Sequence, residues 1–218
     1  MWTRLARLAA LEYRLELRQR AALASVLLFV VGTAYLFSLT FGRLEPRLWN
    51  ALFWIVLLFG ATNGLGQAFR RELTYRYAYY AQLAPPLALY FAKVVFNAAF
   101  LSLVGALTWL LLALLFGNAV RDPALFALAI ALGSVGLSLV LTFLALLAGR
   151  VTNGPGTVAI LAFPVVIPLL LTLVKLGAVA TRVVQQTSTD QDVLTLAGID
   201  LLALGLAIGL VPVAWREA

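Results

Sequence analysis

The sequence predicts an all-α integral membrane protein with six transmembrane helices, and three observations support this fold class. Of its 218 residues, 63% are hydrophobic and 11% are charged, and the mean hydropathy is +1.00. Soluble domains carry about 25% charged residues. The apolar residues form six blocks, each long enough to cross a bilayer as a helix, which takes about 20 residues. Because the gaps are short, we expect one transmembrane domain over residues 1–218.

The predicted spans cover residues 21–41, 49–69, 87–116, 124–147, 157–179 and 193–213. Residues 2–20 precede them and favour an amphipathic helix lying on the membrane surface, with arginines at helical spacing along one stripe. This stripe suits either an anchor on anionic lipid or a contact with a cytoplasmic partner. In the second span, Trp49 and Trp54 suit an aromatic belt at the outer membrane surface.

Residues 70–84, between spans two and three, favour a short helix in the plane of the membrane that ends at Pro85-Pro86. Glu72 and Arg76 are spaced for an ion pair along one helix face. The stretch is rich in tyrosine, including Tyr75, Tyr79 and Tyr80, and protein interfaces favour this residue. Two interpretations stay open: a coupling helix that docks on a cytoplasmic motor, or a tyrosine-rich interfacial turn.

The distribution of basic residues predicts that both termini are cytoplasmic, because cytoplasmic loops are enriched in Lys and Arg. The four basic residues expected on the outer face are Arg43, Arg47, Arg121 and Arg182. The eleven expected on the cytoplasmic side are Arg4, Arg7, Arg14, Arg18, Arg20, Arg70, Arg71, Arg76, Lys93, Arg150 and Arg216. The net charge of +7 therefore reflects membrane topology and does not indicate a nucleic-acid partner.

Span five contains Pro164 and Pro168, four residues apart. Each proline lacks an N–H group and leaves a backbone carbonyl without its helical donor, so we expect a kink or a break. Free carbonyls are tolerated in a bilayer only when protein or a water-lined cavity covers them. We therefore expect this stretch to face inward and to act either as a hinge or as a static kink.

Two charges are predicted within the outer parts of the last two spans. Lys175 lies near the end of span five, and Asp200 lies seven residues into span six. Intramembrane charges usually pair or line a pathway, so we predict an ion pair between Lys175 and Asp200. The alternative is that Lys175 extends its side chain to the outer surface.

Small residues mark two further seams, at 133–138 in span four and at Gly205 and Gly209 in span six. Such residues allow close helix contact. They suit packing within the subunit or contact with a second copy of the chain.

The composition excludes several kinds of site. The sequence has no Cys and no His, and its single Met is Met1. Disulfides, ordinary zinc sites and most haem-iron ligands are therefore excluded. We expect no directly bound cofactor or metal and no catalytic residue.

Several stretches make the chain resemble the CcmB family of cytochrome c maturation proteins. They are Arg71-Glu72-Leu73, Leu83-Ala84-Pro85, Lys93, Gly149-Arg150, the double-proline segment 163–171, Lys175, Leu15-Glu16-Leu17-Arg18 and Trp215-Arg216. The family differs at positions that match Arg76 and Tyr79, where many members have Gly and Glu. The resemblance covers essentially the whole chain.

This resemblance implies a non-enzymatic permease subunit of an ABC-2-type haem transporter in the inner membrane. It implies partners as well: a separate CcmA-like ATPase, a second copy of the chain, a CcmC-like haem-handling protein, a CcmD-like tethering subunit and a CcmE-like haem chaperone. ATP would act only through the ATPase, to release the haem-loaded chaperone, and haem would be a transported or handled ligand. Under this hypothesis Lys175 and Arg182 meet haem propionates, an acidic partner or lipid phosphates.

Two alternatives stay open at this point. The first is an ABC-2-type exporter subunit for another substrate, such as a lipid or a drug. The second is a membrane scaffold that transports nothing and assembles haem-handling proteins.

Overall fold

The computed structural model describes residues 20–65, 85–148, 155–184 and 189–216, and all regular structure in these ranges is α-helical. The helices are α2 (Arg20–Thr40), α3 (Pro46–Leu65), α6 (Pro86–Phe116), α7 (Pro123–Ala148), α8 (Pro155–Ala180) and α9 (Thr189–Arg216). The all-α prediction is therefore confirmed for this part of the chain. Residues 1–19 and 66–84, which hold the predicted surface helix and the coupling segment, lie outside the described ranges.

Proline and glycine mark the helix ends. Helices α3, α6, α7 and α8 all begin at a proline, whose missing N–H costs nothing in a first turn. Helix α6 ends at Phe116 and is followed by Gly117, which has a φ of 85° that favours glycine. Before α7, the carboxylate of Asp122 accepts a hydrogen bond from the N–H of Leu125 at 3.0 Å, which caps the helix.

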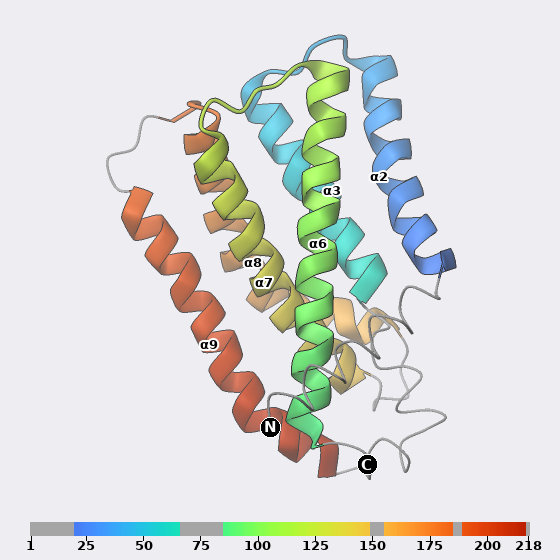
Figure 1. The fold of residues 1–218 in the computed structure, drawn as a ribbon, viewed down its shortest axis with the longest axis vertical. Helices are drawn as coiled ribbons and strands as arrows, with labels where there is room; N and C mark the ends of the chain where they lie inside the picture. Colours follow the sequence, from blue (N-terminus) through green and yellow to red (C-terminus); the bar gives the residue numbers. More distant parts are fainter. Residues whose placement is uncertain (1–19, 66–84, 149–154, 185–188, 217–218) are drawn as a thin grey trace.

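The helices alternate in direction along the bundle (Figure 1). Helices α2, α6 and α8 run towards one end, and α3, α7 and α9 run back. The connections at 41–45, 117–122 and 181–184 all lie at the upper end in Figure 1. This end carries the four basic residues predicted for the outer face: Arg43, Arg47, Arg121 and Arg182. The up-and-down order agrees with the predicted topology, while its orientation in the membrane stays a prediction.

Three helices in the described ranges are long and apolar enough to cross a bilayer: Pro86–Phe116, Pro123–Leu147 and Thr189–Ala214. Shorter apolar stretches lie at Ala24–Thr40 and Val166–Ala180. Helix α7 contacts α3, α6, α8 and α9 and is the centre of the bundle. In the most apolar stretch of α7, 61% is buried inside the bundle, whereas the figure for α9 is 17%, so α9 is peripheral.

An aromatic cluster fills the core where α3 meets α7. Trp49, Phe53, Trp54 and Phe126 are all at most 1% exposed, and the rings of Phe53 and Phe126 are 4.8 Å apart. The prediction that Trp49 and Trp54 form a surface belt is therefore wrong. The reason is that α3 packs against α2, α6, α7 and α8, so these two indoles point into the bundle.

Candidate functional site

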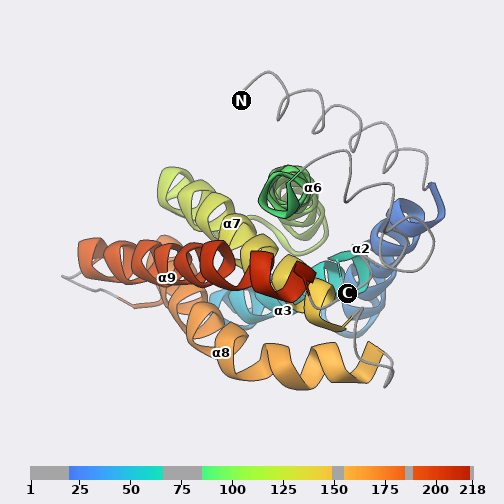
Figure 2. The same cartoon turned by 90° about the horizontal axis from the view of Figure 1, so that it is seen from below.

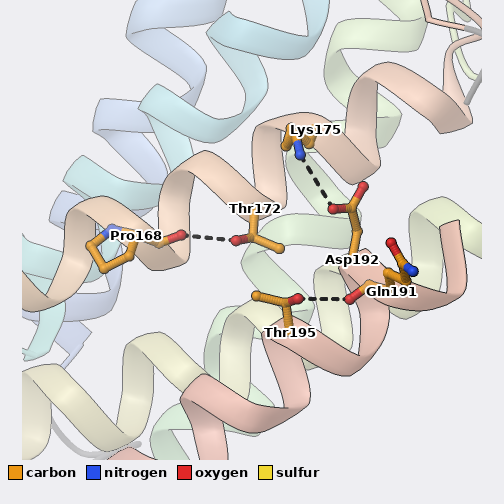
Figure 3. A network of polar contacts seen from close by, with 6 residues as sticks. All are labelled: Pro168, Thr172, Lys175, Gln191, Asp192 and Thr195. Carbon is orange, nitrogen blue, oxygen red and sulfur yellow. Dashed lines mark hydrogen bonds and ion pairs between the residues drawn. The ribbon is translucent and has the colours of Figure 1, made fainter. Parts of the chain in front are cut away.

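Helix α8 carries three of the sequence-predicted functional residues, Pro164, Pro168 and Lys175, and its contacts define the candidate site. Near its upper end, the Lys175 ammonium lies 3.4 Å from the Asp192 carboxylate of α9 (Figure 3). The Lys175 side chain is 59% exposed, whereas that of Asp192 is 12% exposed. This pair links α8 to α9 at the edge of the bundle.

The predicted ion pair between Lys175 and Asp200 is wrong, because Lys175 instead meets Asp192. Helices α8 and α9 run antiparallel, so residues pair when they lie equally far from the α8–α9 connection. Lys175 is five residues before the end of α8, and Asp192 is three residues after the start of α9. At 1.5 Å per residue, Asp200 lies about 12 Å deeper than Asp192. The helix begins at Thr189, four residues earlier than the predicted span, which brings Asp192 into its first turn.

Asp200 is buried between α9 and α7. Neither of its carboxyl oxygens has a hydrogen-bond partner among the described residues. It packs directly against Gly136, where an added Cβ would clash with the carboxyl group and would lie 2.8 Å from Leu169 Cδ1. Gly136 therefore makes room for the Asp200 carboxyl group, which has no hydrogen-bond donor in the described part of the chain.

The opposite side of α8 is fastened to α3. The side-chain amide of Asn50 donates to the carbonyl of Val174 at 2.9 Å, and its oxygen accepts from Trp54 Nε1 at 3.0 Å. Gly177 lies against both side chains, and its missing Cβ is what allows the approach. Sequence reasoning missed Asn50; a lone amide in the outer part of an apolar span was the available signal.

The loop before α7 also holds α8. The backbone N–H groups of Arg121 and Asp122 both donate to the carbonyl of Ala180 at 2.9 Å. These bonds satisfy a carbonyl at the C-terminus of α8 that has no partner within the helix. The upper end of α8 is thus tied to both α3 and α7.

The two prolines lie inside a continuous helix that bends. Helix α8 runs without interruption from Pro155 to Ala180, and Figure 2 shows it changing direction along its length at one edge of the bundle. This bend agrees with the predicted kink, and the hinge role of the two prolines stays a prediction. The prediction that the stretch faces inward is wrong for Pro168, which is exposed together with Ile167 and Leu171. The side chain of Pro164 lies outside the described part.

Thr172 contributes one local bond near the prolines. Its hydroxyl donates to the carbonyl of Pro168 at 2.9 Å (Figure 3). Thr195 makes the equivalent bond to the Gln191 carbonyl at 2.7 Å on the facing turn of α9. Both hydroxyls are satisfied within their own helices, so neither links α8 to α9.

Arg182 does not continue the α8 helix. The helix ends at Ala180, and Arg182 is exposed in the following turn with a φ of 54°. Lys175 and Arg182 therefore do not share the face of one continuous helix. Both still lie at the same end of the bundle.

The predicted coupling residues Glu72, Tyr75, Arg76, Tyr79 and Tyr80 all lie outside the described residues. Sequence reasoning also missed two polar links between α6 and α7. The Tyr90 hydroxyl donates to the Leu139 carbonyl at 2.7 Å, and the Asn97 amide donates to the Thr142 hydroxyl at 2.9 Å. These bonds hold α6 to the central helix.

The described residues contain no group of three or more acidic side chains placed to hold a metal ion. The arrangement suggests a mechanical role: the bent helix α8 is held on one side by several hydrogen bonds and on the other, among the described residues, by one partly exposed ion pair.

A comparison with curated proteins finds no match. A comparison with protein-family models matches the family described as CcmB protein over residues 3–217. Since that match spans almost the whole sequence, the chain belongs to the CcmB family.

Proposed function

We propose that this chain is one half of the membrane part of an ABC system and that a separate CcmA-type ATPase moves it to release a haem-loaded chaperone. CcmB proteins are the membrane component of a haem-export ABC system in cytochrome c maturation. The observation that carries the proposal is the family match over residues 3–217. The sequence also has no G-x-x-x-x-G-K-[S/T] nucleotide-binding motif, so ATP hydrolysis is assigned to another chain.

In this mechanism the ATPase acts on residues 70–84. Glu72 and Arg76 provide charges, and Tyr75, Tyr79 and Tyr80 provide rigid contact area for the docking site. Movement of this segment is relayed through α8 to the outer face, where Lys175 and Arg182 meet an acidic group. The bend of α8 and its one-sided attachment to α3 support this role.

The prolines provide the hinge in this mechanism. Replacing Pro164 and Pro168 with Ala restores both backbone donors and should stiffen α8. We expect the double variant to insert normally in the membrane and to reduce the yield of mature cytochrome c. Full cytochrome c maturation in the double variant would falsify the hinge.

The partners are tested by purifying the tagged chain in mild detergent. We expect a CcmA-like ATPase to co-purify, together with CcmC-, CcmD- and CcmE-like proteins and a second copy of the chain. An ATPase with an inactive nucleotide site should still assemble and should fail to support cytochrome c maturation. Normal maturation with that inactive ATPase would favour a scaffold that only assembles haem-handling proteins.

A further inference from the structure

Asp200 is a buried acid that the proposed mechanism does not use. It is 7% exposed, and neither of its carboxyl oxygens has a hydrogen-bond partner among the described residues. It lies about 17 Å along α9 from Thr189, which is near the middle of a bilayer whose core is about 30 Å thick. An ionised carboxylate without a partner is costly at this depth, so the group needs a bound positive ion to neutralise it.

The ionisable groups of α7, α8 and α9 do not supply that charge in the described part of the chain. Helix α7, against which Asp200 packs, has no ionisable residue between Pro123 and Ala148. The one ionisable residue of α8 is Lys175, and its ammonium pairs with Asp192, about 12 Å above Asp200. The acids Asp190 and Asp192 of α9 both lie towards the upper end and carry the same charge as Asp200.

The ionisable residues of α6, which also contacts α9, are Tyr90 and Lys93. The Tyr90 hydroxyl already donates to the Leu139 carbonyl. Lys93 lies one turn below Asn97, and Asn97 donates to Thr142. Thr142 is six residues, about 9 Å, below the point on α7 that meets the buried carboxyl group. Lys93 is therefore in the lower part of the bundle.

The boundary between α8 and α9 is polar above Asp200. The pair of Lys175 and Asp192 lies at the upper end, and the hydroxyls of Thr172 and Thr195 lie three residues deeper, about 5 Å along each helix (Figure 3). One carboxyl oxygen of Asp192 is also buried without a partner among the described residues. Buried oxygens are usually satisfied by protein donors or by water, so we expect water to enter this boundary from the upper end.

Below Asp200, the same face of α9 is apolar. Ala207 and Val211 belong to an apolar cluster with Leu89 of α6. Above Asp200, the one fully buried apolar side chain on this face is Leu196, one turn away, which closes the route in this conformation among the described residues. The polar approach from the upper end therefore favours exchange with that side of the membrane, which is the predicted outer face.

We propose that Asp200 is a proton-binding site that exchanges with the outer aqueous phase along the boundary between α8 and α9. A carboxylate oxygen takes a proton from a hydronium ion and leaves a water molecule. A proton needs one oxygen, whereas a metal ion such as Ca²⁺ needs several, and the residues that meet Asp200, Gly136 and Leu169, have no side-chain oxygen. The site goes beyond the proposed function, because binding a proton requires neither ATP nor haem.

Dicyclohexylcarbodiimide tests the site, because this apolar reagent modifies protonated carboxyl groups within a membrane. The complete complex is treated in sealed vesicles with the upper end outward, and the modified residue is identified by mass spectrometry. We expect modification of Asp200 in the unchanged chain and in Asp192→Asn, and none at this position in Asp200→Asn. Modification should fall at least tenfold as the outer pH is raised at constant inner pH.

Three results would overturn the proton site. They are no modification of Asp200, modification that does not respond to the outer pH, and modification that disappears in Asp192→Asn. Protection of Asp200 by sodium or calcium ions at constant pH would overturn it as well, in favour of a metal-ion site.

The route is tested separately with single-cysteine variants, which need no background substitutions because the sequence contains no cysteine. Thr172→Cys is compared with Leu110→Cys on α6, which is 57% exposed and lies six residues from the upper end of its helix, against eight for Thr172. A membrane-impermeant thiol reagent needs water to form the reactive thiolate, so we expect Thr172→Cys to react at least tenfold faster. Equal rates, or faster reaction at Leu110→Cys, would overturn the route between α8 and α9.

Discussion

The two sides of α8 differ in how firmly they are attached. Towards α3 and α7, the helix is held by the buried amide of Asn50, by the close approach at Gly177 and by two backbone bonds to Ala180. Towards α9, the described residues provide one polar contact, the pair of Lys175 and Asp192, and they provide no hydrogen-bond partner for the buried Asp200. The polar contacts of α8 in the described residues are therefore stronger towards α3 than towards α9.

The largest expected effect is on the α3 side, from Gly177→Val. The new side chain would collide with Asn50 and Trp54, and overpacking of this kind costs about 2 kcal/mol. We expect the free energy of unfolding in detergent to fall by that amount, as followed by tryptophan fluorescence during denaturation. Gly198→Val on α9 is the matched control, because a Cβ there meets nothing within 4 Å in the described part. Equal losses in both variants would remove the distinction between the two sides.

A gain is expected from Asp200→Asn on the α9 side. The variant keeps the shape that fits against Gly136 and removes a carboxyl group for which the described residues provide no partner. Because an intramembrane acid is costly, we expect the free energy of unfolding to rise by about 1 kcal/mol. The same denaturation measurement serves here. A clear loss of stability would mean that Asp200 has a stabilising partner in the membrane.

The smallest effect is expected at the ion pair. Lys175 is more than half exposed, and pairs of this kind contribute about 0.5 kcal/mol. In a double-mutant cycle, Lys175→Gln and Asp192→Asn should show a coupling of that size that weakens with added salt. Lys175→Gln and Asp200→Asn should show none. A coupling with Asp200 that exceeds the one with Asp192 would restore the sequence-based pairing.

Much of the helical framework could be predicted from the sequence, because long apolar runs bounded by proline and glycine determine it locally. Helix α6, for example, begins one residue before the predicted span and ends with it, at Phe116. The site was less predictable, since its contacts depend on the register between helices. The start of α9 at Thr189 selects Asp192 as the partner of Lys175, and nothing in the apolar pattern reveals that start.

The outward direction of Pro168 could not be predicted from the sequence either. Helical spacing places Pro168, Leu171 and Lys175 on one face, but which face α8 presents to α7 depends on packing across the bundle. The same holds for Trp49 and Trp54, whose burial follows from the several helices around α3. The local sequence does not determine such contacts between helices.

The proposed function has ATP-driven motion relayed through α8, and we expect this motion to change the spacing between α9 and the upper end of α8, which is tied to α3. Spin labels on Leu48→Cys of α3 and Leu194→Cys of α9 test it most directly, in complexes where doubly labelled chains are diluted with unlabelled ones. We predict that the distance distribution shifts between the nucleotide-free and ATP-trapped complexes, while that between Leu48→Cys and Leu110→Cys of α6 stays constant. An unchanged α3–α9 distance, or a shift confined to the α3–α6 pair, would contradict the account.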